Sequence, residues 1–306
     1  MLIGVVAYFV FVSLPLSAEI HQLANKTVAV VQPLLLFLML FISFCKIDPT
    51  KIRPRRWHLW LILIQAGSFI VLALVSQFID NYNVSILFEC AMICMIAPTA
   101  TAAIVVTDKL GGNTLTITAY TIMINIVTSV VFSLFIPFVN PTVGMSFWQA
   151  FTIIVKQVFP LLVFPFLLAW LVRLFLPNLL NIILRIKDLA FYLWMVALAI
   201  ALSVTTRALV HSNISVWCFF GILLITLICC ISQFYIGKRI GSLYADRISA
   251  GQSLGQKNTV FIIWTAYTFM NPVTAVAGGF YSIWHNSINS YQLYKKRKKD
   301  RAERKV

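Results

Sequence analysis

The sequence predicts an all-α integral membrane protein, and its composition and hydropathy support that fold class. Hydrophobic residues make up 60% of the 306 residues, charged residues make up 11%, and the mean hydropathy is +0.91. Soluble globular domains carry about 25% charged residues, which excludes a soluble fold. About ten stretches are long and apolar enough to cross roughly 30 Å of hydrocarbon as helices. We place these spans at residues 2–18, 28–46, 57–78, 85–107, 114–139, 148–175, 187–206, 214–236, 247–267 and 270–293.

The first span, 2–18, is expected to be retained and not to be a signal peptide. It lacks a basic region before its apolar part and a clear small-residue cleavage site after it. The chain is expected to form one domain, 1–306. Ten spans divide into five and five, and an odd number per half gives two inverted repeats. We place repeat one at about 1–140, repeat two at about 147–294 and a cytoplasmic basic tail at 295–306.

The basic residues are distributed by loop, as expected for signals of membrane topology. Most of the 24 Lys and Arg residues fall on one side, for example Lys187 and the tail 295–306, whereas Lys26 and Arg207 fall in the opposite loops. Because cytoplasmic loops are enriched in Lys and Arg, both termini are predicted to be cytoplasmic. The net charge of +15 is interpreted in this way and not as a nucleic-acid surface. We expect a multi-pass protein of a bacterial inner (plasma) membrane, with the lipid bilayer as a partner.

Two spans at matching positions of the repeats are interrupted, which predicts a pair of broken, crossing helices. In the fourth span, Pro98 follows the apolar run and cannot donate a backbone hydrogen bond. In the ninth span, a polar run begins at Gly251, contains Gly255 and ends at Thr259. Broken helices offer free backbone groups at midplane depth, so a matched pair indicates the central site of a transporter. Two ordinary helix kinks are the alternative.

Lys257 is the most informative single residue, because a charge near the bilayer midplane is costly. Such a residue normally faces a polar cavity or a partner. A lysine that snorkels to the membrane interface is the alternative. Ser253, Gln256 and Asn258 belong to the same polar run and are expected to share the site.

Four further polar residues are expected to contribute to this site. Gln65 interrupts an apolar span and needs hydrogen-bond partners. Thr101 follows the first break, and Thr121 lies in the fifth span. His285 lies near the middle of the last span, where it either relays a proton or bonds a neighbouring helix.

One carboxylate, Glu89, lies just inside the fourth span near its non-cytoplasmic end. Its expected role is electrostatics at an entrance or pairing with Lys156, and carrying a proton is the alternative. No nucleophile with a base at readable spacing, no phosphate-binding loop and no metal-ligand pair is found, so we do not expect an enzyme or a cofactor. The six cysteines also lack the spacing of a disulfide framework or a zinc site.

The layout of spans and the last two spans resemble the bile acid:sodium symporter family. The resemblance covers essentially the whole chain and is strongest from Gly251 to Ser287, which ends in Phe280-Tyr-Ser-Ile-Trp-His-Asn-Ser. In the first half, Pro98-Thr-Ala-Thr-Ala-Ala-Ile104 stands where the family has proline, glycine-glycine, threonine, alanine, serine and asparagine. The resemblance implies a panel of spans one, two, six and seven and a core of the other six. It also implies amphipathic or small organic anions as substrates, driven by two sodium ions at the helix crossing.

Most of the family's sodium ligands are replaced in this chain. The replacements are Ala103 and Ile104 after the first break, Ile117 in the fifth span, and Ser253 and Lys257 in the ninth, whereas Gln65, Thr121 and Asn258 match. At an effective dielectric of about 20, an ammonium about 4 Å from a sodium ion repels it by roughly 4 kcal/mol. We therefore expect Lys257 to replace the ion as a tethered cation. Sodium binding is then weak or absent, and coupling is to protons or absent altogether.

Three functions remain open. The leading hypothesis is a secondary transporter of a small organic anion that works by alternating access. The second is a non-transporting membrane receptor or interaction protein with the same fold. The third is an arsenite-type exporter, for which Cys90 and Cys94, one helical turn apart, are the only hint.

Overall fold

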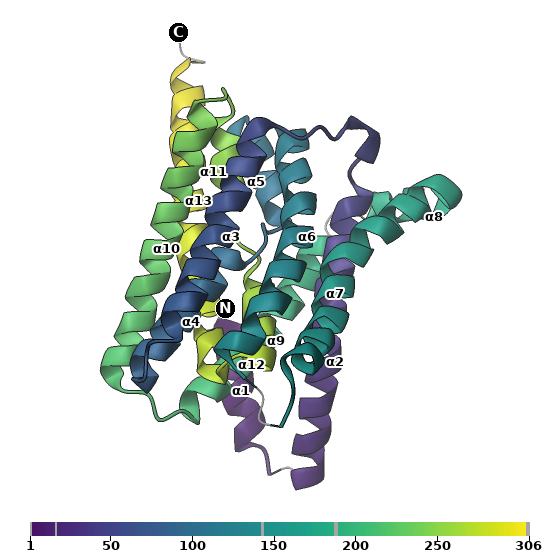
Figure 1. Ribbon diagram of the computed structural model, residues 1–306. Helices are drawn as coiled ribbons and strands as arrows, with labels where there is room; N and C mark the ends of the chain where they lie inside the picture. Colours follow the sequence, from purple (N-terminus) through teal and green to yellow (C-terminus); the bar gives the residue numbers. More distant parts are fainter. Residues whose placement is uncertain (1, 16, 142–143, 187–188, 304–306) are drawn as a thin grey trace.

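The protein is all-helical, as its sequence predicts. The computed structural model describes residues 2–15, 17–141, 144–186 and 189–303, and these ranges contain thirteen α-helices, two short 3₁₀ helices and no β-strand. Most helices stand side by side, while α8 (Pro177–Arg185) projects sideways from the bundle (Figure 1). Of the basic residues used to predict topology, Lys187, Arg304 and Lys305 lie outside the described residues.

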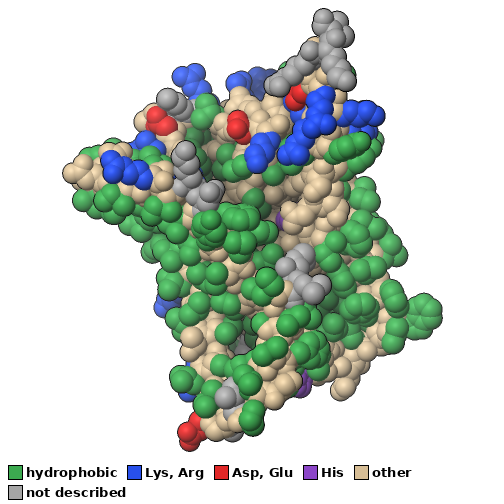
Figure 2. Space-filling view, turned by 180° about the vertical axis from the view of Figure 1, so that it is seen from behind, with side chains coloured by type: hydrophobic (Ala, Val, Ile, Leu, Met, Phe, Trp, Pro, Cys, Tyr) green, Lys and Arg blue, Asp and Glu red, His purple; other side chains and the backbone are tan. Residues whose placement is uncertain are grey.

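Six helices in the described ranges are long and apolar enough to span a membrane, judged by length and composition. They are α2 (Ala18–Cys45), α3 (Arg56–Ser76), α6 (Thr114–Val139), α7 (Phe147–Phe175), α9 (Leu189–Val210) and α10 (Val216–Ser242). Hydrophobic side chains cover the flanks of the molecule, and Lys and Arg gather mainly at the end that carries the C-terminus (Figure 2). The chain is therefore a multi-pass integral membrane protein, because helices that satisfy their own backbone groups can face lipid.

Both interrupted spans consist of two helices. The predicted span 85–107 is α4 (Tyr82–Ile96) followed by α5 (Ala102–Leu110), and the predicted span 247–267 is α11 (Arg247–Gly255) followed by α12 (Thr259–Phe269). Pro98 lies in the first break, as predicted. The second break begins later than predicted, since Gly251 lies inside α11 and Gly255 is the last residue of that helix.

Helix boundaries differ from the prediction where polar residues continue a helix. α2 begins ten residues before the predicted 28, where the Ser17 side chain accepts a hydrogen bond from Ile20 N at 3.4 Å. α13 (Val276–Glu303) continues through the predicted tail, supported by ion pairs from Lys296 to Asp300 and from Lys299 to Glu303. Hydropathy predicts only the apolar part of a helix and does not detect polar residues that extend the helix beyond it.

The remaining short elements also modify the predicted layout. α1 (Leu2–Ser13) is shorter than the predicted span 2–18, and η1 (Pro49–Lys51) lies in the loop after α2. α8 was not predicted. Its first residue, Pro177, and its polar residues Asn178, Asn181 and Arg185, which are three and four positions apart, are typical of an amphipathic helix. η2 (Pro272–Ala275) occupies the start of the predicted span 270–293.

Glycines bring α10 and α11 into close contact. A Cβ at Gly237 would lie 2.5 Å from the backbone oxygen of Ala250 and 3.0 Å from Gly251 Cα. A Cβ at Gly255 would lie 2.3 Å from the ring of Phe234. Gly251 and Gly255 therefore serve the packing of α11 against α10, which explains why the helix continues through them.

The close approach of α10 and α11 predicts opposite effects for the same substitution at two glycines. Gly237→Ala is expected to lower the free energy of unfolding by about 1–3 kcal/mol, because its Cβ overlaps a backbone atom that cannot move aside alone. Gly67→Ala in α3 is the control, since nothing lies within 4 Å of that Cβ. It is expected to stabilise the protein by about 0.5–1 kcal/mol. Thermal unfolding of both purified variants tests this, and equal effects would contradict it.

Candidate functional site

The two helix breaks cross and are joined through their backbones. Asn258 N donates to Pro98 O at 2.8 Å, and Ala100 N donates to Gln256 O at 2.9 Å. Thr99 and Lys257 lie opposite each other at the centre of this antiparallel bridge. The crossing thus satisfies four backbone groups that the interrupted helices leave without intrahelical partners.

Side chains from four other parts of the fold cap the C-terminal end of α4. The last carbonyls of a helix lack intrahelical donors and carry partial negative charge. The hydrogen bonds are Gln233 Nε2 to Cys94 O at 3.2 Å, Lys257 Nζ to Met95 O at 3.2 Å, Thr128 Oγ1 to Ile96 O at 2.9 Å, and Gln65 Nε2 to Ile96 O at 3.0 Å and Ala97 O at 2.9 Å. This helix end is therefore bonded to α3, α6, α10 and the second break.

The C-terminal end of α11 is capped in a similar way. Thr99 Oγ1 donates to Ser253 O at 2.6 Å, and the Tyr281 hydroxyl donates to Gly255 O at 2.9 Å. Gln233 Nε2 in turn donates to Tyr281 Oη at 3.1 Å. At the end of α4, the corresponding pair is Tyr120 on α6, whose hydroxyl donates to Gln65 Oε1 at 2.9 Å. A glutamine and a tyrosine hence meet at each helix break.

Lys257 lies at the centre of the crossing with its side chain fully buried, at 0% exposure. This contradicts the alternative of a lysine that snorkels to the interface. Nζ donates to Met95 O, and the titratable groups that influence it electrostatically are the thiols of Cys94, Cys229 and Cys230. Met95 and the three cysteines do not line the cavity described next, so the amine points into the core between α4 and α10.

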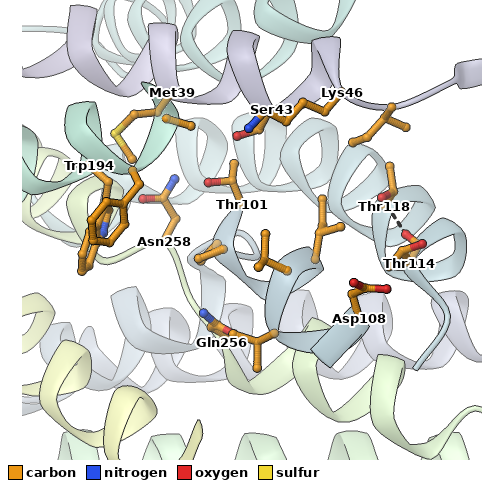
Figure 3. Close-up of a pocket in the computed structure, with 18 of the residues that line it drawn as sticks. Met39, Ser43, Lys46, Thr101, Asp108, Thr114, Thr118, Trp194, Gln256 and Asn258 are labelled. Atoms are coloured by element: carbon orange, nitrogen blue, oxygen red, sulfur yellow. Dashed lines mark hydrogen bonds between the residues drawn. The ribbon is translucent and has the colours of Figure 1, made fainter. Parts of the chain in front are cut away.

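A cavity of about 750 Å³ reaches the crossing. Its walls come from the ends of α2 and α9 on one side, and from α5, α6, the two breaks and α13 on the other. Figure 3 shows Thr101, Gln256 and Asn258 at the breaks, with Ser43 and Lys46 of the α2 end across from Thr101. Asp108 and Lys109 belong to the last turn of α5, at the basic end of the molecule. The cavity therefore runs from the basic end to the middle of the bundle.

Most of the predicted site residues meet at the crossing, and several line the cavity. The cavity-lining residues are Thr101, Gln256, Lys257, Asn258 and His285. Gln65 and Ser253 lie in the crossing behind the cavity wall. Thr121 is separate from the crossing bonds, because its hydroxyl donates to Ile117 O one helical turn back at 2.8 Å.

Two buried polar atoms at the cavity have no partner within the described chain. They are Gln256 Oε1 and His285 Nδ1, on residues that are 2% and 4% exposed. Asn258 Oδ1, in contrast, accepts from Phe261 N at 3.2 Å and caps α12. The N-terminal ends of α5 and α12 lie beside these groups at the inner end of the cavity. Helix N-termini attract anions, so the ends of α5 and α12 favour negative charge, whereas Gln256 Oε1 requires a hydrogen-bond donor.

The sequence suggested that Glu89 pairs with Lys156, but the structure does not show this pair. It is buried on α4, where Oε1 accepts from Asn140 Nδ2 at 3.3 Å and Oε2 accepts from Asn271 N at 3.0 Å and Thr274 Oγ1 at 2.7 Å. Lys156 lies exposed on α7. Glu89 thus fastens α4 to the end of α6 and to the turn after α12, at the end of the bundle opposite the cavity mouth.

Sequence reasoning missed three groups of this site, namely Gln233, Tyr120 and Tyr281. Gln233 carried the same signal as Gln65, an amide inside an apolar span that needs partners. The two tyrosines had no such signal, because a tyrosine in an apolar helix is common. Within the described residues, no cluster of three or more His, Cys, Asp or Glu side chains is arranged to hold a metal ion.

Comparison of the chain with protein-family models finds no matching family, and comparison with curated proteins finds no match. The resemblance to bile acid:sodium symporters therefore rests on the sequence pattern described above.

The capping role of Gln65 predicts a large difference between two buried amides. Gln65→Leu leaves Ala97 O and the Tyr120 hydroxyl without their partners, each costing about 1–3 kcal/mol. Asn125→Leu in α6 is the control, because neither polar atom of this buried side chain has a partner. It is expected to change stability by less than about 1 kcal/mol or to stabilise. Thermal unfolding distinguishes them, and a Gln65→Leu protein as stable as the native one would contradict the capping role.

Proposed function

We propose that the protein is a secondary transporter that works by alternating access and is a divergent relative of the bile acid:sodium symporters. The observation that carries this proposal is the pair of broken helices, crossing in the middle of the bundle at the inner end of a large cavity. Irregular backbone at membrane depth is tolerated where it is buried in protein or lines a water-filled cavity. Transporters place their sites at such breaks.

The helices fit ten membrane segments in two inverted repeats. The segments are α1, α2, α3, α4 with α5, and α6 in the first half, and α7, α9, α10, α11 with α12, and α13 in the second. Corresponding helices then carry corresponding groups, since Gln65 on α3 meets Tyr120 on α6 while Gln233 on α10 meets Tyr281 on α13. The antiparallel bridge between Thr99 and Lys257 has the local two-fold character that such repeats require.

The same helices divide into a panel and a core. In one group, α1 packs on α9, α9 on α2 and α2 on α7. The helices α3, α4, α6, α10, α11 and α13 pack among themselves, and α6 also packs on α7, which follows it in the chain. The cavity lies between the two groups and opens toward the basic end. If that end is cytoplasmic, as the Lys and Arg distribution predicts, the described conformation is inward-open. Movement of the core against the panel would close this side and open the other.

The substrate that fits the cavity is a small organic anion with an apolar part. The N-terminal ends of α5 and α12 provide positive partial charge at the inner end. Phe191 and Trp194 of α9 provide apolar surface beside it. The acidic side chains that line the cavity, Asp48 and Asp108, belong to its outer part, where they do not oppose an anion bound at the breaks.

Lys257 supports transport without sodium. Its ammonium or amine bonds the carbonyl end of α4, which is the role that a bound cation would have at a broken helix. The matching polar groups are already engaged, because Gln65 bonds Tyr120 and two carbonyls, Thr121 bonds Ile117 O and Asn258 caps α12. The chain therefore places an amine of its own where an exchangeable cation would bind.

Transport is tested with purified protein in two steps. A panel of labelled mono- and dicarboxylates is screened by thermal stability, since a ligand at 100 times its dissociation constant stabilises by about 2.7 kcal/mol. Anions that stabilise the protein are then tested for counterflow in proteoliposomes. We expect counterflow with the native protein, loss of it in Thr101→Trp, which fills the cavity beside the breaks, and retention in Thr152→Trp on the exposed face of α7. Binding without counterflow would favour the receptor hypothesis.

Sodium independence is a separate prediction. The native protein is expected to unfold at the same temperature in sodium and in choline at equal ionic strength. The reason is that Lys257 occupies the place where a sodium ion would bind, so sodium gives no binding energy to the folded state. Lys257→Gln carries the residue that the related family has at this position and serves as the comparison. A sodium-specific stabilisation of the native protein would contradict the proposal that Lys257 replaces the sodium ion.

A further inference from the structure

Lys257 has too few partners in this conformation for a permanently charged ammonium. A protonated lysine has three N–H donors and no acceptor. The structure provides one hydrogen bond, to Met95 O at 3.2 Å, for a side chain that is 0% exposed. A buried charge is expensive unless it is paired and fully hydrogen-bonded.

No counter-charge compensates for this shortage. The titratable groups that interact with Lys257 in the described chain are the thiols of Cys94 on α4 and of Cys229 and Cys230 on α10, and no carboxylate is among them. The Tyr281 hydroxyl on α13 is engaged with Gly255 O. An uncharged amine, by contrast, carries no charge to compensate and has the Met95 carbonyl as an acceptor.

We propose that Lys257 is a proton-binding site of the folded protein, unprotonated in the conformation described here and protonated in another. Lys257 and its neighbours Gln256 and Asn258 all belong to the cavity lining, although the lysine side chain is 0% exposed. A movement of the crossing that opens the core to the cavity would therefore expose the amine to water. Taken with the proposed transport function, on which this consequence rests, the proton replaces sodium as the coupling ion. Uptake of one proton with each anion would also keep a monovalent substrate electroneutral.

The test uses the proton itself as the ligand and needs no substrate. Thermal unfolding of the native protein and of Lys257→Met is measured from pH 5 to pH 9 in the same detergent, with Lys298→Met on the exposed tail helix as the matched control. Where the folded amine is unprotonated and the unfolded one is charged, unfolding takes up a proton, so raising the pH stabilises the native protein. The methionine variant lacks this gain.

The expected result is a difference in Tm between Lys257→Met and the native protein that depends on pH in two different ways. Toward high pH, the native protein gains stability and Lys257→Met does not. The ratio of their unfolding equilibrium constants therefore changes tenfold per pH unit, and the difference between their Tm values shrinks by on the order of 3 °C per pH unit. Toward low pH, the difference becomes constant, because the folded protein then holds the proton as well. Lys298→Met is expected to differ from the native protein by the same amount at every pH.

Two results would overturn the proposal. A difference that is constant over the whole range would mean that the lysine stays charged as a fixed cation. A difference that slopes down to pH 5 without levelling would mean that the folded protein never binds the proton. Lys257→Gln repeats the measurement should the methionine variant fail to fold. Because no substrate is used, failure of counterflow leaves this result unaffected, and a negative result here leaves an uncoupled transporter possible.

Discussion

A helix that stops inside a membrane leaves carbonyl and amide groups that no water can satisfy, and this constraint governs the centre of the molecule. The chain meets it by crossing two interrupted segments, so that each supplies part of what the other lacks. Pro98 O and Gln256 O accept backbone N–H groups from the opposite break, and side chains cover the remaining carbonyls. Each buried polar group left unpaired would cost about 1–3 kcal/mol, so these contacts fix the positions of the surrounding helices.

The same constraint explains why the crossing suits a moving part. Its bonds come from α3, α6, α10 and α13, which all belong to one group of helices, whereas α2 and α9 meet it across the cavity. In the proposed transport cycle, the polar centre would therefore remain satisfied as this group moved as a unit against its neighbours. Close contacts between backbones, such as that of Gly237 with α11, keep this group of helices rigid, because they leave no space into which a helix could shift.

The sequence predicted the membrane class from overall apolarity, and it predicted the two interrupted segments and the burial of Lys257 from local departures from that apolarity. Gln65 was predictable for the same reason. The partners were not, since the bond from Lys257 to Met95 joins residues 162 positions apart and depends on the angle at which two helices cross. The prediction also placed the second break too early, at Gly251, because a glycine that permits close packing and a glycine that ends a helix look alike in a single sequence.

Lysine at the crossing changes what an ion site can do. An exchangeable cation binds from solution, and its occupancy follows the ion concentration on each side of the membrane. A lysine cannot leave, so the only exchangeable species is its proton. The cost of burying a charge then becomes a means of control, because the protonated form requires water or an anion nearby and the unprotonated form does not. A binding site at the same breaks would supply that anion, and the two occupancies would become mutually dependent through the energy of one buried side chain.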